Sequence, residues 1–321
     1  MSHPVANRRT FGRGRWSAAD LVERKRRQDL RISVVLPARD EEKTIGSIVE
    51  RLVADLVDGE PLVDELVVVD SDSTDATYEV AAAAGARVHR ASEIAPELGS
   101  RPGKGEAMWK SLFVTEGDVL VFMDADLVEW DTDFVVSLVG PFLEDPAIDL
   151  VKGFYERPLI LGDGSALAAG RVTELVARPV IALQWPELSG LVQPLAGEWA
   201  IRRSWFAELS VPTGYAVELA ALVDTAAAHG ASAIAQVDLG RREHGHQGLH
   251  DLGVMATQIL AMARDRARAD GTAGPETVHL RQFAIRDEEP VALDRFVPVD
   301  ERPPAVTVPR YASRDAAEHP C

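Results

Sequence analysis

The sequence predicts an α/β fold, in which a mostly parallel sheet is covered by helices on both faces and is followed by a mixed C-terminal part. Short apolar segments alternate with helical segments over roughly the first 155 residues, a pattern typical of parallel strands joined by helical crossovers. Polar clusters follow three of these apolar segments, at the edge where such sheets bind ligands. Beyond residue 156 the alternation is less regular.

The first half alternates strand and helix along the chain. Apolar residues at helical spacing between residues 45 and 57 predict an amphipathic helix. An alanine-rich helix is expected to end at Gly85, because glycine is a common helix terminator. A loop at residues 101–105 precedes a third helix, which we expect to end at Gly117. The strands are predicted at residues 32–36, 65–70, 87–89 and 119–123.

The second half mixes helical and extended patterns. Helices are predicted at residues 171–183, with Pro179 as a kink or break, at 215–229, ending at Gly230, and at 249–268. Extended segments are expected at 191–202 and 234–239. The tail from about residue 287 contains six prolines and many charges, so we expect it to wrap the surface or to be partly disordered.

Charge and composition exclude several classes of protein. The net charge is −17, which argues against nucleic acid as a general partner. Residues 1–31 carry nine Lys and Arg against three Asp and Glu, and we interpret residues 24–27 as the solvated face of a helix capped by Ser17, with Asp20 completing a capping box. No apolar run reaches the roughly 18 residues of a membrane span. The single cysteine, Cys321, allows no internal disulfide and favours a reducing cytoplasm.

Two carboxylates follow the strand predicted at residues 119–123. Side chains alternate along a strand, so Asp124 and Asp126 are expected on the same side, where they suit a hard divalent cation. The alternative is that such an acidic pair only caps the next helix. The segment 37–41 and Ser71 follow two other predicted strands, and the convergence of all three clusters favours a ligand site.

Two common nucleotide-binding motifs are missing from the sequence, and their absence limits the kinds of nucleotide site that the chain could form. No Gly-x-Gly-x-x-Gly follows the first strand, and Gly103-Lys104-Gly105 lacks the hydroxyl residue of a phosphate-binding loop. The remaining interpretation is a nucleotide held by loops, with its diphosphate reached through a metal ion.

These motifs resemble those of the GT-A glycosyltransferases, whose fold is Rossmann-like, and among them the actinobacterial glucosyl-3-phosphoglycerate synthases. The general motifs lie at residues 33–38, 70–75, 101–107 and 124–126, and narrower ones lie at 170–179, 193–198, 214–218 and 235–240. The resemblance covers roughly residues 15 to 265. It implies transfer of glucose from UDP-glucose to the 2-hydroxyl of D-3-phosphoglycerate, with retention at the anomeric carbon and with Mg²⁺ or Mn²⁺.

The resemblance also implies a division of the chain and a set of donor-binding residues. Residues 1–31 would form a basic arm, 32–155 the nucleotide-sugar half, 156–270 the acceptor half, and 271–321 a charged, proline-rich tail. Asp126 and His244 are implied as the metal ligands. The residues implied to bind the donor are Pro37, Ala38, Arg39, Asp40, Glu41, Ser71, Lys104, Asp124, Ala125, Leu195, Gly197, Tyr215, Glu218 and Arg242.

An acceptor with a phosphate and a carboxylate needs cationic and N–H groups. The implied acceptor residues are Gly170, Arg171, Val172, Thr173 and His246, the last at a position where these enzymes are expected to carry a side-chain amide. For Lys152, Arg157 and Arg178 we expect solvated positions instead.

For retention we favour attack from the leaving-group face, with the departing phosphate taking the acceptor proton. Glu218 would then orient glucose or the acceptor rather than act as the nucleophile, although a solvated helix position is its alternative. The transition state would be stabilised by a divalent ion on the diphosphate and by oxygen atoms near the sugar.

Three other functions are alternatives to this one. An inverting transferase of the dolichol-phosphate type, a nucleotidyltransferase, and a sugar-nucleotide-binding regulator without turnover all share parts of the pattern. The residues do not distinguish a UDP-linked donor from a GDP-linked donor, or glucose from mannose as the sugar. The resemblance further implies a homodimer that makes glucosylglycerate precursors of compatible solutes or methylglucose polysaccharides.

Overall fold

A computed structural model describes residues 9–156, 159–160, 166–167, 170–241, 249–268, 274–286 and 289–318 of the chain. Its centre is an eight-stranded sheet in which β9 runs antiparallel to both of its neighbours and the other pairs are parallel. In sheet order the strands are β1 (Thr10–Phe11), β11 (Ile234–Arg241), β6 (Leu150–Glu156), β9 (Trp199–Arg202), β5 (Val119–Phe122), β2 (Ile32–Ala38), β3 (Glu65–Asp70) and β4 (Arg87–Arg90).

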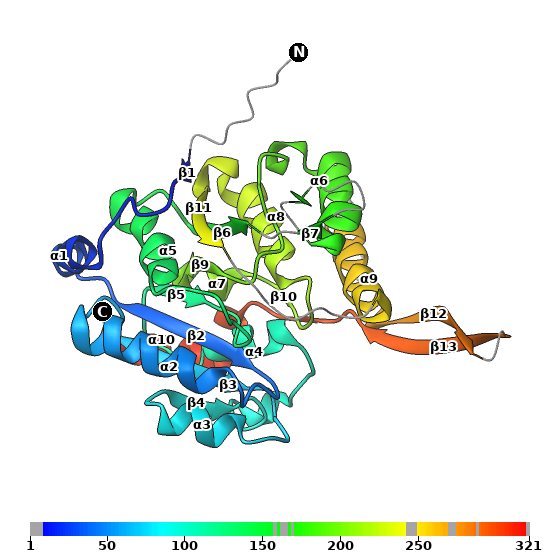
Figure 1. Ribbon diagram of the computed structural model, residues 1–321, viewed down its shortest axis with the longest axis horizontal. Coiled ribbons are helices and arrows are strands. Elements are labelled where there is room, and N and C mark those ends of the chain that lie inside the picture. The colour runs from blue at the N-terminus through cyan, green and yellow to red at the C-terminus, as the bar shows by residue number, and fades with distance from the viewer. Residues whose placement is uncertain are drawn as a thin grey trace, which may run out of the picture.

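The predicted mostly parallel sheet with helices on both faces is confirmed (Figure 1). Strand β2 lies between β3 and β5, with Ser33 opposite Glu65 and Ile32 opposite Val119. This register brings the carboxyl ends of the three strands to one edge, as the sequence predicts. Strands from the basic arm, the first half and the second half all join this one sheet.

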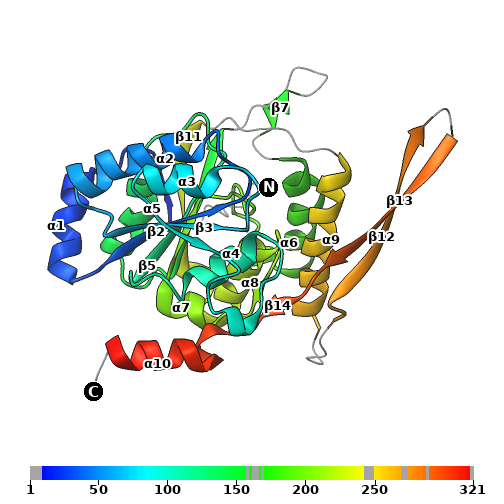
Figure 2. The same cartoon turned by 90° about the horizontal axis from the view of Figure 1, so that it is seen from below.

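Two hydrophobic cores lie on the two faces of the sheet. Because side chains alternate along a strand, Val34 and Leu36 of β2 enter one core and Val35 enters the other. Helices α1, α2, α3 and α5 cover the first face, and α4, α7 (Arg203–Glu208) and α8 (Val217–His229) cover the second (Figure 2).

The helices of the first half are α1 (Ala18–Gln28), α2 (Ile45–Leu52) with the π-helix η1 (Val53–Gly59), α3 (Thr77–Ala83), the 3-10 turn η2 (Pro96–Leu98), α4 (Lys104–Ser111) and α5 (Asp133–Glu144).

The leading helix is capped as predicted, but one of its basic residues is buried. The Ser17 hydroxyl accepts a hydrogen bond from the Asp20 N–H at 3.2 Å. Lys25, expected on a solvated face, donates instead to the carbonyls of Pro61 and Leu62 and to the Asp64 carboxylate at 2.8 Å. The helix face that packs on the sheet therefore includes one ammonium, which the buried acceptors satisfy.

Most of the elements predicted in the second half are present. The segment 191–202 is an exception, because only its last four residues form a strand and the preceding residues form turns. The helices of this half are the π-helix η3 (Thr173–Ala177), α6 (Arg178–Gln184), η4 (Pro186–Leu188), α7 (Arg203–Glu208), α8 (Val217–His229), η5 (Ala231–Ala233) and α9 (Leu249–Arg266). The short strand pairs are β7 (Leu159–Ile160) with β8 (Ala166–Leu167), and β10 (Val211–Pro212) with β14 (Glu301–Arg302).

The C-terminal tail is more regular than predicted. Strands β12 (Thr277–Arg286) and β13 (Glu289–Pro298) form a hairpin that extends away from the body of the molecule (Figures 1 and 2). The chain then returns through β14 and η6 (Ala305–Thr307) to α10 (Pro309–Glu318), which lies beside the sheet domain. Proline is tolerated near the ends of a strand and at the start of a helix, so Pro290 and Pro298 of β13 and Pro309 of α10 are compatible with regular structure. Within the described residues, none of the helices is both long and apolar enough to cross a membrane.

Candidate active site

The loops that follow β2 and β3 are tied together by hydrogen bonds. The N–H of Ser71 donates to the carbonyl of Ala38 at 2.8 Å, and the N–H of Asp40 donates to the Ser73 hydroxyl at 2.9 Å. Asp40 has a φ of +57°, a left-handed conformation that aspartate tolerates better than most residues. The Asp40 carboxylate accepts from the Thr74 N–H at 2.8 Å. The structure thus brings together the predicted donor residues of these two loops.

The Asp-x-Asp segment follows β5 at the same edge. The hydroxyl of Thr44, next to the predicted loop, donates to the carbonyl of Ala125 at 2.7 Å. Burial and the nearby carboxylates of Asp126 and Asp124 together raise the pKa of the Glu41 carboxyl to about 7, against a hydrogen bond from Thr44 that lowers it. The loop after β2 and the Asp-x-Asp segment are therefore close enough to interact electrostatically.

Lys104 connects the Asp-x-Asp segment to α8. Its ammonium lies 2.5 Å from Oδ1 of Asp124 and 2.9 Å from Oε1 of Glu218. Burial alone lowers the pKa of Lys104, but the two carboxylates more than reverse this effect and raise it. Glu218 is 6% exposed, so the alternative of a solvated helix position for it is wrong. The ammonium stays charged between two anions.

The segment 193–198 passes directly over Asp124. A methyl group built on Gly197 would lie 2.1 Å from Oδ2 of Asp124, so only glycine fits there without moving the carboxylate. The carbonyl of the preceding Ala196 accepts a hydrogen bond from the ammonium of Lys152 at 2.6 Å. Lys152 is 1% exposed, which corrects the expectation of a solvated position. Leu195, beside them, is partly buried against the core.

Tyr215 lies within the electrostatic reach of this cluster. Burial raises the pKa of its phenol, Lys104 lowers it, and Glu218 and Asp124 raise it. The Tyr215 N–H donates to Oε1 of Gln258 on α9 at 2.9 Å, which holds the turn before α8. Of the other donor candidates, Pro37 lies in β2, and the Arg39 side chain is exposed, with its Nε 3.8 Å from the Asp40 carboxylate.

The predicted acceptor residues begin a helical segment that continues as η3 and α6. Gly170 and Arg171 open this segment, and Val172 and Thr173 are buried in it. The turn packs against α9 and shares a hydrophobic core with α8, the helix that carries Glu218. Its role in acceptor binding stays a prediction. Arg178, expected in solvent, is half-buried and donates to the carbonyls of residues 191 and 192.

The carboxylates at this edge of the sheet are suited to a divalent cation. Asp124 and Asp126 carry carboxylate oxygens of the kind such an ion prefers, and the raised pKa of Glu41 indicates that carboxylates are crowded at this edge. Among the residues that the structure describes, no group of three or more His, Cys, Asp and Glu could hold a metal ion. The predicted ligand His244 lies outside the described residues, as do Arg242, His246 and Arg157. The Asp126–His244 pair remains a prediction.

Comparison with known proteins assigns the chain to a family. A family model described as glycosyl transferase family 2 matches residues 33–161. The glucosyl-3-phosphoglycerate synthase of Mycolicibacterium paratuberculosis is 45% identical over 304 residues, covering 89% of this chain and 91% of the relative. The synthase of Petrotoga mobilis is 40% identical, with 93% of each chain covered. The chain belongs to the glucosyl-3-phosphoglycerate synthase family.

Solved structures of this family share the fold. The glucosyl-3-phosphoglycerate synthase of Mycobacterium tuberculosis, crystallised with Mn²⁺ and UDP-glucose, is 43% identical, with a TM-score of 0.81 and coverage of 92% of this chain and 97% of that chain. The same enzyme has also been crystallised with Mn²⁺, UDP and glucosyl-3-phosphoglycerate, again at a TM-score of 0.81. The GT-A glycosyltransferase fold predicted from the sequence is thereby confirmed.

Two residues that support the site escaped sequence reasoning. The sequence did not predict the burial of Lys152, because a single lysine in a short apolar segment is also compatible with an exposed position at the edge of a strand. The Thr44 contact with Ala125 joins residues 81 positions apart, and only the pairing of β2 with β5 brings them together. The apolar neighbours of Lys152, Leu150 and Val151, were the one signal that could have indicated its burial.

Proposed function

We propose that this chain is a retaining glucosyltransferase that moves glucose from UDP-glucose to the 2-hydroxyl of D-3-phosphoglycerate and releases UDP. The observation that carries the proposal is the Lys104–Asp124–Glu218 cluster at the carboxyl edge of the sheet. It lies in a chain that is 43% identical to a synthase crystallised with UDP and the glucosylated product.

The charges of the cluster suit a diphosphate leaving group. The partly buried Lys104 ammonium stays protonated, and it provides positive charge beside the Asp-x-Asp segment, where the donor diphosphate would bind. A divalent ion bound with Asp126 would stabilise negative charge on the departing UDP. Mg²⁺ and Mn²⁺ are the proposed ions, because the M. tuberculosis enzyme has been crystallised with each of them together with UDP.

Glu218 is proposed to orient glucose or the acceptor rather than to attack the anomeric carbon. Its Oε1 atom is held 2.9 Å from the Lys104 ammonium, and an ion-paired carboxylate is a poorer nucleophile than a free one. Retention then follows from attack of the acceptor hydroxyl on the face that UDP leaves, with the departing phosphate taking the proton. Leu195, Gly197 and Tyr215 would line the glucose site.

The acceptor is proposed to bind at Gly170–Thr173 together with His246. The start of the helical segment offers backbone N–H groups, and Arg171 adds a guanidinium for the phosphate or carboxylate. The M. tuberculosis enzyme has been crystallised with phosphoglyceric acid alone, so that family member binds the acid without the donor.

The test measures UDP release from UDP-glucose with Mg²⁺ or Mn²⁺ in the presence of D-3-phosphoglycerate, D-glycerate or 2-phosphoglycerate. We expect release with D-3-phosphoglycerate alone, and loss of release with a chelator or with Asp126→Ala. Asp133→Ala serves as the matched control, because Asp133 is an exposed carboxylate in the first turn of α5. Equal release with all three acids would contradict the acceptor assignment, and release from GDP-glucose instead would contradict the donor.

We further propose a homodimer. Several large apolar side chains are exposed on the hairpin and on neighbouring helices, namely Leu183 (78%), Leu260 (50%) and Phe296 (75%). Light scattering should give twice the mass of the 34.8 kDa chain, and Phe296→Ser should shift it toward the monomer. A monomeric wild-type protein would contradict this. A cytoplasmic location is also proposed, supported by the single cysteine, which leaves no internal disulfide.

A further inference from the structure

A buried arginine near the C-terminus holds the start of α4. Arg302 of β14 is 5% exposed, and its guanidinium donates two hydrogen bonds to Glu106, at 2.7 Å from Nε and 2.6 Å from Nη2. It also donates to the carbonyls of Leu98 at 2.9 Å and Gly99 at 3.1 Å. The central carbon of the guanidinium, Cζ, lies over the ring of Trp109, 5.1 Å from its centre. We call these contacts the Arg302 clamp.

The clamp acts on the turn that carries Lys104. Glu106 lies two residues after Lys104, in the first turn of α4, and its N–H donates to the carbonyl of Thr213 at 3.0 Å. A methyl group on Gly105 would lie 1.9 Å from the carbonyl oxygen of Pro212, and one on Gly103 would lie 2.3 Å from that of Thr213. The first turn of α4 is therefore packed against β10 and the residue after it without free space, and Arg302 binds the same turn through the Glu106 carboxylate.

The same C-terminal segment also holds the approach to Glu218. The carbonyl of Asp300 accepts a hydrogen bond from the Thr213 N–H at 3.1 Å, and the Asp300 carboxylate accepts one from the Thr213 hydroxyl at 3.1 Å. Gly214 and Tyr215 then lead directly into α8, where Glu218 lies in the first turn. Residues 300–302 thus contact both backbone segments that deliver the Lys104–Glu218 ion pair.

We propose that Arg302 is a positioning residue for the glucosyl transfer: through Glu106 it fixes the first turn of α4 and so places the Lys104 ammonium between Asp124 and Glu218. The inference rests on the proposed function. Lysine cannot replace the guanidinium here, because an ammonium lacks the planar fork that serves both carboxylate oxygens and the two carbonyls. With Arg302→Lys, Glu106 keeps a cation nearby but loses its fixed orientation, and Lys104 is expected to shift with it.

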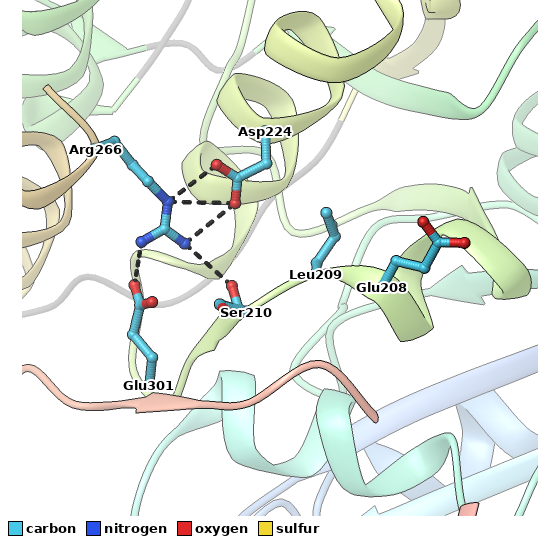
Figure 3. A pocket seen from close by; sticks show the side chains of 6 residues that line it. All are labelled: Glu208, Leu209, Ser210, Asp224, Arg266 and Glu301. Carbon is cyan, nitrogen blue, oxygen red and sulfur yellow. Dashed lines mark hydrogen bonds and ion pairs between the residues drawn. The ribbon is translucent and has the colours of Figure 1, made fainter. Parts of the chain in front are cut away.

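A neighbouring arginine provides a matched control. Arg266 of α9 also binds this C-terminal segment, donating to Glu301 at 2.6 Å, to Asp224 at 2.9 Å and to the carbonyl of Ser210 at 3.1 Å (Figure 3). These residues line an open pocket of about 310 Å³ together with Glu208 and Leu209. The Arg266 contacts join α9 to α8, β14 and the residue before β10, and they include no residue of α4. Arg266→Lys therefore disturbs an ion pair of the same type without contacting the turn that carries Lys104.

The experiment is a double-mutant cycle that combines Arg302→Lys with Lys104→Met. We measure kcat/KM for UDP-glucose, the Kd of UDP with Mn²⁺, and the Tm of each variant. In the presence of Lys104, Arg302→Lys should lower kcat/KM about tenfold and weaken UDP binding, whereas in the Lys104→Met background it should change both by less than about twofold. Arg266→Lys should lower the Tm similarly while kcat/KM stays within about twofold of wild type.

Equal losses in both backgrounds would overturn the proposal, because they would assign Arg302 a purely structural role. If Arg302→Lys does not fold, Glu106→Gln enters the same cycle, since it keeps the side-chain shape and removes the charge that the guanidinium binds. A wild-type chain that releases no UDP with any acid would refute the proposed function instead. The clamp would still be tested in that case by the dependence of UDP affinity on Arg302 and Lys104.

Discussion

Replacing Lys152 with methionine should change how stability depends on pH. Lys152 of β6 is 1% exposed; its ammonium donates to the carbonyl of Ala196 at 2.6 Å and lies 5.4 Å from the centre of the Trp199 ring. The pKa of Lys152 is lowered from 10.5 to about 7, mainly because the ammonium is buried; Glu218 opposes this shift and Lys104 adds to it. Methionine has a similar length and no charge to desolvate.

The sign and size of the effect follow from the two pKa values. Between pH 7 and 10.5 the unfolded chain binds a proton at Lys152 that the folded chain has released, so the free energy of unfolding rises with pH. Below about pH 7 both states are protonated and the cost of burial is present in full. At about 1.4 kcal/mol per pH unit, the contribution of Lys152 should become less unfavourable by about 2–3 kcal/mol between pH 6 and pH 9.

Urea unfolding of the wild-type protein and of Lys152→Met at pH 6, 7, 8 and 9 measures this contribution. Other titrating groups affect both proteins equally, so the difference between the two profiles reports on Lys152. We expect the wild type to gain about 2–3 kcal/mol relative to the variant over this range. Parallel profiles would refute the reasoning, because they would show that Lys152 has the same pKa in the folded and unfolded chains. The variant also leaves the Ala196 carbonyl without its donor, which offsets all four measurements equally.

Three further outcomes are expected. Gly197→Ala places a methyl group 2.1 Å from Oδ2 of Asp124, so kcat/KM should fall about 100-fold with the fold intact by circular dichroism; unchanged activity would show that the carboxylate can move freely. Glu218→Gln should lower kcat by about 10²- to 10³-fold and give no covalent glucosyl-enzyme in mass spectra. A glucosyl adduct trapped on Glu218 of the wild-type enzyme would instead identify this residue as a nucleophile. Phe206→Ala removes a fully buried ring packed on Phe122, and it should cost about 3–5 kcal/mol in urea unfolding; a cost below 1 kcal/mol would contradict the packing.

The sheet and its ligand edge could be predicted because their signals are local. The apolar runs of β2, β3 and β5 have strand length, and helical crossovers between them require parallel pairing, so their carboxyl ends had to meet. Asp124 and Ser71 follow such ends directly in the sequence. Their place at the edge needed no knowledge of tertiary packing.

Contacts between distant segments could not be predicted in this way. Lys104 and Glu218 lie 114 residues apart, and their ion pair depends on how α4 and α8 pack on the same face of the sheet. Arg302 and Glu106 are joined only because the chain returns from the β12–β13 hairpin as an edge strand beside β10. The proline content of the tail suggested irregular structure, whereas Pro290 and Pro298 lie near the two ends of β13 and Pro309 begins α10.

The charges of the site are divided between two regions. Beside Gly197, the carboxylates of Asp124 and Glu218 share the Lys104 ammonium, which offsets one of the two negative charges in the region proposed to bind the sugar. At the loop after β2, burial and the carboxylates of Asp126 and Asp124 raise the pKa of Glu41 to about 7, which indicates an excess of negative charge. We expect a divalent cation to be attracted mainly to this second region. On this expectation Asp126, rather than the ion-paired Glu218, is the carboxylate for a metal ion, which agrees with the separate roles proposed for the two residues.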